Sequence, residues 1–176
     1  MKFLLFILSI LSSNGIWASS ETTCVQQMMQ TYQFKESEAF QICQIHSPVS
    51  QVCVKDIISR FPTLVRESAV KLCVLGSSPG TGDCFRKATV NCGLEEPKSV
   101  ELCSRSQSEA PAECYRNIIL VGGITSNIAI QTCVNAADTR PVQCARDALL
   151  LQGLSVDQVP HLCATPFKIP KYIIQN

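Results

Sequence analysis

The chain has few of the residues on which enzymes and nucleic-acid-binding proteins depend. Its 176 residues include two histidines and one tryptophan, and aromatic residues make up 6% of the total. No Cys-x-x-Cys pair occurs, so neither a redox dithiol nor a zinc ribbon is indicated. Its 15 basic and 14 acidic residues nearly balance, which argues against nucleic acid or an anionic membrane as partner. We predict a protein that is not an enzyme and has no cofactor or metal.

Long hydrophobic runs are also scarce, and the one clear apolar run lies at the start. Residues 1–18 have the layout of a cleaved signal peptide, with Lys2 before an apolar run and the small residue Ala18 at the end. That run is too short to span a bilayer, and no later run is longer. All eleven cysteines follow this segment, which indicates disulfides formed in an oxidising compartment. We therefore expect secretion, to the periplasm or outside the cell, without a membrane span.

The abundant residue is cysteine, and its positions repeat. Two series have a spacing of about 30 residues, and only Cys92 belongs to neither. A period between 20 and 50 residues is typical of stacked supersecondary units. The spacing predicts one repeat domain over 24–163, with repeats 24–43, 53–73, 84–103, 114–133 and 144–163.

Each repeat is predicted to be two short helices joined by a tight turn. Gly93, Gly123 and Gly153 lie in mid-repeat, and glycine is the residue after which a helix most often ends. Ser155 has Gln158 three residues later, as in a capping box. A β-hairpin is the rival, but the repeats lack alternation of period two. The predicted fold class is all-α, a tandem array of five disulfide-stapled helical hairpins that form a short α-solenoid.

Two disulfide patterns fit the spacing, one within repeats and one across the linkers that follow them. Pairing across linkers leaves Cys24, Cys163 and Cys92 without partners, whereas pairing within repeats leaves only Cys92. Counting therefore favours pairing within repeats. Each bond would close a loop of about 20 residues and contribute roughly 3 kcal/mol. The cysteines concerned are Cys24, Cys43, Cys53, Cys73, Cys84, Cys103, Cys114, Cys133, Cys144 and Cys163.

Two features are candidates for binding. A basic residue stands two places after the first cysteine of four repeats, at Lys55, Arg86, Arg116 and Arg146. Stacked in register, these side chains would form a stripe that binds an anionic polymer or an acidic protein surface. The alternative is that they form ion pairs with nearby acids such as Asp56, Glu113 or Asp147.

Cys92 is the second candidate. It is either an exposed thiol that links this chain to a second copy or another protein, or a buried and inert side chain. The C-terminal tail, residues 164–176, is predicted to cover the last hairpin, because Phe167, Ile169, Tyr172 and two further isoleucines are too apolar to remain in solvent. The alternative for the tail is strand addition to a partner.

For function we favour an exported, non-enzymatic scaffold that binds an as yet unidentified protein or polymer, because repeat arrays present extended surfaces. The first alternative is a structural component of an envelope, coat or matrix, cross-linked through Cys92. The second is an enzyme whose site is assembled across repeats, for instance from Asp138, Arg140 and His161. Ser68-x-x-Lys71 has the spacing of some acylating enzymes, but it has no companion motif.

Overall fold

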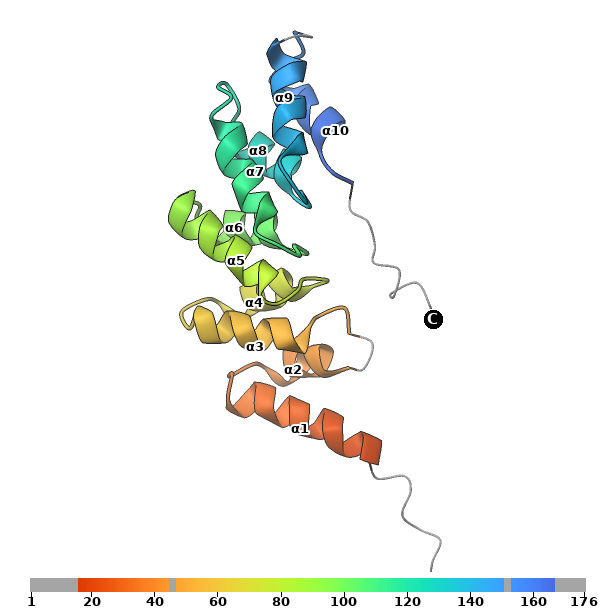
Figure 1. Cartoon of the computed structure of the whole chain (residues 1–176). Helices are drawn as coiled ribbons and strands as arrows, with labels where there is room; N and C mark the ends of the chain where they lie inside the picture. The colour runs from red at the N-terminus through yellow and green to blue at the C-terminus, as the bar shows by residue number, and fades with distance from the viewer. Residues whose placement is uncertain (1–15, 45–46, 151–152, 167–176) are drawn as a thin grey trace, which may run out of the picture. The chain divides into compact units, whose positions relative to one another are not determined.

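The computed structural model describes residues 16–44, 47–150 and 153–166, and all regular structure in these ranges is helical. A single isolated β-bridge joins Val49 and Val74. The chain forms two compact units, Met1–Ser47 and Pro48–Asn176. The predicted fold class is confirmed, because the helices come in pairs and each pair is joined by a disulfide (Figure 1).

The first unit is one helical hairpin. It consists of α1 (Ile16–Gln30) and α2 (Glu36–Cys43), joined by the Cys24–Cys43 disulfide. Met28 and Phe34 are buried between the two helices together with Ala39 and Ile42. The predicted signal peptide lies outside the described residues except for Ile16–Ala18, which form the first turn of α1.

The second unit contains the other four hairpins. Its helices and their bounds are α3 (Gln51–Arg60), α4 (Arg66–Cys73), α5 (Gly80–Arg86) with the π-helical η1 (Lys87–Asn91), α6 (Glu96–Cys103), α7 (Ala110–Ile119), α8 (Ser126–Cys133), α9 (Arg140–Leu150), and α10 (Val159–Cys163), which follows the 3-10 turn η2 (Val156–Gln158).

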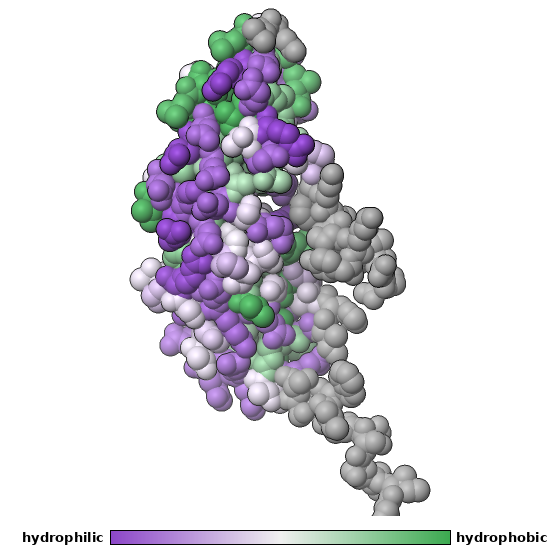
Figure 2. All heavy atoms as spheres, viewed as in Figure 1, coloured by the Kyte–Doolittle hydropathy of each residue, from purple (hydrophilic) through white to green (hydrophobic). Residues whose placement is uncertain are grey.

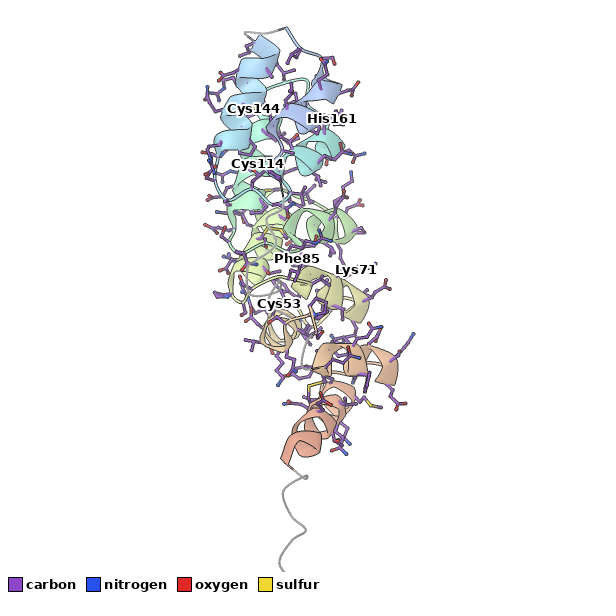
Figure 3. The ribbon with its side chains drawn as sticks, turned by 90° about the vertical axis from the view of Figure 1, so that its right-hand side faces the viewer. Cys53, Lys71, Phe85, Cys114, Cys144 and His161 are labelled. Atoms are coloured by element: carbon purple, nitrogen blue, oxygen red, sulfur yellow. A yellow bond between two sulfur atoms is a disulfide. The ribbon has the colours of Figure 1, made fainter. Side chains whose placement is uncertain are left out.

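These helices form two layers. The first helices of the hairpins, α3, α5, α7 and α9, contact one another in sequence order, and the second helices, α4, α6, α8 and α10, do the same. Figure 3 shows the layers side by side, with Cys53, Cys114 and Cys144 in the first and Lys71 and His161 in the second. The core lies between the layers, where Ile57, Leu72 and Leu102 are fully buried.

Disulfides join the two layers within every hairpin of this unit. The pairs are Cys53–Cys73, Cys84–Cys103, Cys114–Cys133 and Cys144–Cys163. Pairing within repeats, rather than across linkers, is therefore the pattern of the structure. Helices of 8 to 11 residues such as α4 and α9 are too short to be stable alone, and each bond holds two of them together.

The turns inside the last three hairpins have the predicted glycine, whereas those of the first two hairpins have none. Gly93, Gly123 and Gly153 adopt positive φ angles of 66°, 72° and 63°, which only glycine takes without a Cβ clash. After Gly93 the amide of Leu94 bonds to the carbonyl of Ala88, six positions earlier, and this bond closes the turn. The predicted capping box is also present, because the amide of Ser155 donates to Gln158 Oε1 at 3.0 Å.

The first helices begin earlier than the cysteine spacing suggested. Cys84, Cys114 and Cys144 stand in the second turn of α5, α7 and α9, because the last residues of each preceding linker are already helical. Pro111 and Pro141 are part of this early turn. Proline indicates a loop in a sequence, but it also fits the first turn of a helix, where the missing N–H costs nothing.

Candidate binding surfaces

The basic residues of the predicted stripe all lie on the first helices. Arg86, Arg116 and Arg146 are exposed, at one position per hairpin of α5, α7 and α9, whereas Lys55 on α3 is half-buried. Within the described residues no ion pair joins any of these three arginines to an acid. Their charges therefore face solvent on one side of the first layer.

The acids proposed as their partners bind other residues. Asp56 accepts from Arg60 at 3.3 Å, and Glu113 accepts from Lys87 at 2.6 Å. Asp147 accepts a hydrogen bond from Gln143 at 2.8 Å. The ion-pair alternative for the stripe is thus wrong for these three acids, because closer cations and amides on the same or the adjacent helix reach them first.

A row of exposed aliphatic residues lies beside the arginines, and the sequence analysis missed it. Val90, Leu120 and Leu150 are 76%, 79% and 70% exposed, and each stands four residues after the arginine of its hairpin. Residues four apart share a face of a helix. We call these six residues, Arg86, Val90, Arg116, Leu120, Arg146 and Leu150, the arginine–aliphatic face.

This row had a signal in the sequence. All three aliphatic residues follow the first cysteine of their repeat by six positions, the same register in each case. This position lies between the apolar positions that recur in the core, four and ten residues after the same cysteine. Figure 2 shows how polar and apolar residues are distributed on this surface. Hydrophilic residues cover the first helices, and separate hydrophobic patches lie toward the edge that carries the hairpin turns.

Cys92 is the one described cysteine without a disulfide, and it is half-buried. Its thiol donates to the carbonyl of Ala112 on α7, with Sγ and O 3.6 Å apart. Burial raises the pKa of the Cys92 thiol, while the charges of Arg116 and Lys87 offset part of the rise. A higher pKa leaves less of the nucleophilic thiolate near neutral pH, so the position does not have the features of a reactive cysteine.

Of the three residues considered for an enzyme site, two are in contact. Asp138 and Arg140 form an exposed pair with the guanidinium Nε and carboxylate Oδ2 2.7 Å apart. Hydrogen bonds from Arg140 lower the pKa of Asp138. His161 lies exposed on α10, on the outer side of the second layer (Figure 3). The pair is a local contact of two residues at the start of α9 and does not extend to the histidine.

A groove runs between α4 and α6 on the second layer. It encloses about 500 Å³ and is lined by Ser68, Lys71, Val74, Pro97, Val100, Glu101, Ser104 and Arg105. Ser68 Oγ donates to Glu96 Oε1 at 2.6 Å, and Lys71 Nζ contacts Glu67 Oε1 at 2.7 Å. The Ser-x-x-Lys spacing therefore does not place the amine beside the hydroxyl, as an acylating site requires.

Among the described residues, no group of histidine, cysteine and acidic side chains is arranged to hold a metal ion, and no helix is long and apolar enough to span a membrane. Comparison of the chain with known protein families, with curated proteins and with solved structures finds no match in any of the three. The surfaces of the molecule are therefore the evidence from which a function is proposed.

Proposed function

We propose that the protein is an exported, non-enzymatic scaffold that binds an acidic protein partner through the arginine–aliphatic face. The observation that carries the proposal is the repetition of one exposed arginine and one exposed aliphatic residue on three successive hairpins. Export is inferred from the five disulfides, since such bonds persist in oxidising compartments.

The composition of the face favours a protein over a charged polymer. A polymer such as a sulfated glycan needs only the cations, and three aliphatic side chains beside them would remain in water. An amphipathic acidic helix would use both rows, because its carboxylates can bond the guanidinium groups bidentately while its apolar side chains cover Val90, Leu120 and Leu150.

The proposed binding is tested with a defined probe. We would label an amphipathic peptide helix that carries glutamates on one edge and leucines on the next, and measure its binding to the oxidised chain by fluorescence anisotropy. Heparin serves as the polymer probe. One variant changes Arg86, Arg116 and Arg146 to Gln, and a second changes Val90, Leu120 and Leu150 to Ser.

The expected result is that both variants lose about tenfold or more in affinity for the peptide, equivalent to about 1.4 kcal/mol or more. The control changes Lys35, Lys71 and Lys98 to Gln, which removes the same charge elsewhere, and should leave the affinity within about twofold. Equal loss in the control, or no binding by the unaltered chain, would overturn the proposal. Tight binding of heparin that the serine variant retains would assign the face to a polymer.

A further inference from the structure

Two pairs of linkers stack in the second unit, and they differ in how they contact each other. Linkers 74–83 and 104–113 form what we call the closed junction, and linkers 104–113 and 134–143 form the open junction. The same backbone recurs in all three linkers, since Leu75, Arg105 and Asn135 occupy equivalent positions and all have positive φ.

At the closed junction, hydrogen bonds join the two linkers directly. Gln107 Nε2 donates to the carbonyl of Leu75 at 2.7 Å, and Thr81 Oγ1 donates to that of Ser106 at 2.8 Å. The amide of Ser77 also bonds to the carbonyl of Ser106 at 3.3 Å. Gly80 lies so near the carbonyl of Gln107 that a Cβ there would collide with it. The linkers leave little space between them.

At the open junction, the two side-chain hydrogen bonds lack the residues that make them. Thirty residues on, Ala137 stands where the closed junction has Gln107, and Pro111 stands where it has Thr81. Neither can donate a side-chain hydrogen bond. Ala110 replaces Gly80 and carries the Cβ that close approach forbids. The linkers are therefore held apart at this level.

The separation leaves a cavity of about 240 Å³. It is lined by Arg105, Ser106, Gln107, Ser108, Asn135, Ala136, Ala137, Arg140, Thr165 and Pro166. Ser106 is 3% exposed, and its hydroxyl has no hydrogen-bond partner among the described residues. Asn135 Oδ1 is also buried, with no hydrogen-bond partner in the part of the chain that the structure describes. A buried polar group without a partner costs about 1–3 kcal/mol, so both atoms point to a ligand that would bond them.

We propose that this cavity binds a small carboxylate that carries an adjacent hydrogen-bond donor, as in a hydroxy acid or an amino acid. Arg105 and Arg140 supply two guanidinium groups to the lining, and none of the lining residues that the structure describes is acidic. Arg140 Nε donates to Asp138 Oδ2 at 2.7 Å, and this bond orients the guanidinium group. Asp138 is not among the lining residues. The ligand's carboxylate would accept from the arginines and Ser106, and its hydroxyl or amine would donate to Asn135 Oδ1.

The proposal is independent of the arginine–aliphatic face, because none of the six residues of that face lines the cavity. A failure of one proposal therefore leaves the other intact.

The test is nuclear magnetic resonance titration of the full oxidised chain with three small probes. L-Lactate has both the carboxylate and the donor, propionate has only the carboxylate, and lactamide has no carboxylate. We expect amide shifts at residues 104–108 and 134–140 that saturate with millimolar lactate, weaken with propionate and vanish with lactamide. Absence of saturable shifts with lactate, or equal shifts with lactamide, would overturn the proposal.

Two variants and one control sharpen the result. Ser106→Ala removes the partnerless hydroxyl and should weaken lactate binding about tenfold. Ala137→Gln places in the cavity the side chain that fills the closed junction, and it should abolish binding while the hairpins stay folded. Ser77→Ala makes the same change as Ser106→Ala at the closed junction and should leave binding unaltered. Binding that persists in Ala137→Gln would contradict the assignment even if Ser106→Ala failed to fold.

Discussion

The closed and open junctions are built from the same repeat, yet hydrogen bonds join the two linkers of one, and a cavity separates those of the other. The first layer shows the same contrast. Arg60 on α3 reaches Asp83 on α5 at 2.7 Å, and Lys87 reaches Glu109 and Glu113 at 3.1 and 2.6 Å. Between α7 and α9 no ion pair occurs among the described residues. The disulfides make every hairpin alike, so the differences between repeats lie in the contacts between hairpins.

Ion pairs join the second hairpin to the third and the third to the fourth, and aromatic packing adds to the first of these two contacts. Arg60 also bonds Asp56 at 3.3 Å and lies over the ring of Phe61, which packs edge-on against Phe85 of the next hairpin. The hydrogen bond to Glu113 raises the pKa of the Lys87 ammonium. Among the described residues no ion pair or ring contact of this kind joins the fourth hairpin to the fifth, so that contact depends more on apolar burial.

The largest effect is expected from removing disulfides on either side of this contrast. Replacing Cys84 and Cys103 by Ala should cost about 3 kcal/mol of unfolding free energy, because the bond closes a loop of 19 residues' separation in a hairpin with neighbours on both sides. Replacing Cys144 and Cys163 opens the terminal hairpin, which should unfold locally and lower the global value less. Urea unfolding followed by circular dichroism, with hydrogen exchange of α9 and α10, separates the two. Equal global losses would contradict the comparison.

A smaller loss is expected from Arg60→Met. The change removes the ion pairs to Asp56 and Asp83 and the contact over Phe61. Because these side chains are partly exposed, the loss should be about 1 kcal/mol in urea unfolding. Arg146→Met, on α9, is the matched control and should change the unfolding free energy by less than about 0.5 kcal/mol. A loss in the control as large as in Arg60→Met would show that the ion pairs contribute nothing.

Exchanging the residue that distinguishes the junctions should give opposite changes. Gln107→Ala removes the bond to the carbonyl of Leu75 and should destabilise the chain by about 0.5–1.5 kcal/mol. Ala137→Gln offers the equivalent bond to the carbonyl of Arg105 and should stabilise it by a similar or smaller amount. Thermal unfolding of both variants against the unaltered chain measures the signs. Destabilisation by Ala137→Gln would mean that Ala110 and Pro111 alone keep the junction open.

The smallest effect concerns Cys92, which follows η1 in the third hairpin and bonds the carbonyl of Ala112 on α7. Because burial raises the pKa of its thiol, alkylation by iodoacetamide should have a pH midpoint above that of the same chain unfolded in urea with its disulfides intact. The folded state prefers the protonated thiol. Its stabilisation is therefore present below the unfolded pKa, about 8.5, and is lost as pH rises through the folded pKa. A midpoint at or below the unfolded value would refute the burial argument.

Much of the fold was predictable because cysteine spacing and glycine position act locally. The two cysteine series indicated five hairpins, and Gly93, Gly123 and Gly153 indicated the turns of the last three. The early starts of α7 and α9 were missed because Pro111 and Pro141 have two meanings, a loop residue or the first turn of a helix.

The binding surfaces were predictable only in part. The register of Arg86, Arg116 and Arg146 was visible in the sequence. They are exposed because they lie on a different face of the helix from the buried positions two residues later. That Asp56 and Glu113 would bond Arg60 and Lys87 instead was not visible, since those cations stand outside the repeating register. The secretion signal, the tail beyond Pro166 and the role of Cys92 in any cross-link stay predictions.

The sequence by itself determined the hairpins, because each is specified by residues within about 30 positions: two cysteines and a buried apolar set, with a turn glycine in the last three. Only the tertiary structure decided which junctions are bonded and which encloses a cavity. Those contacts join residues of different repeats, as Gln107 and Leu75 do, and they depend on whether two backbones approach within hydrogen-bond distance. A single side chain, such as the Cβ of Ala110 in place of Gly80, is enough to prevent that approach.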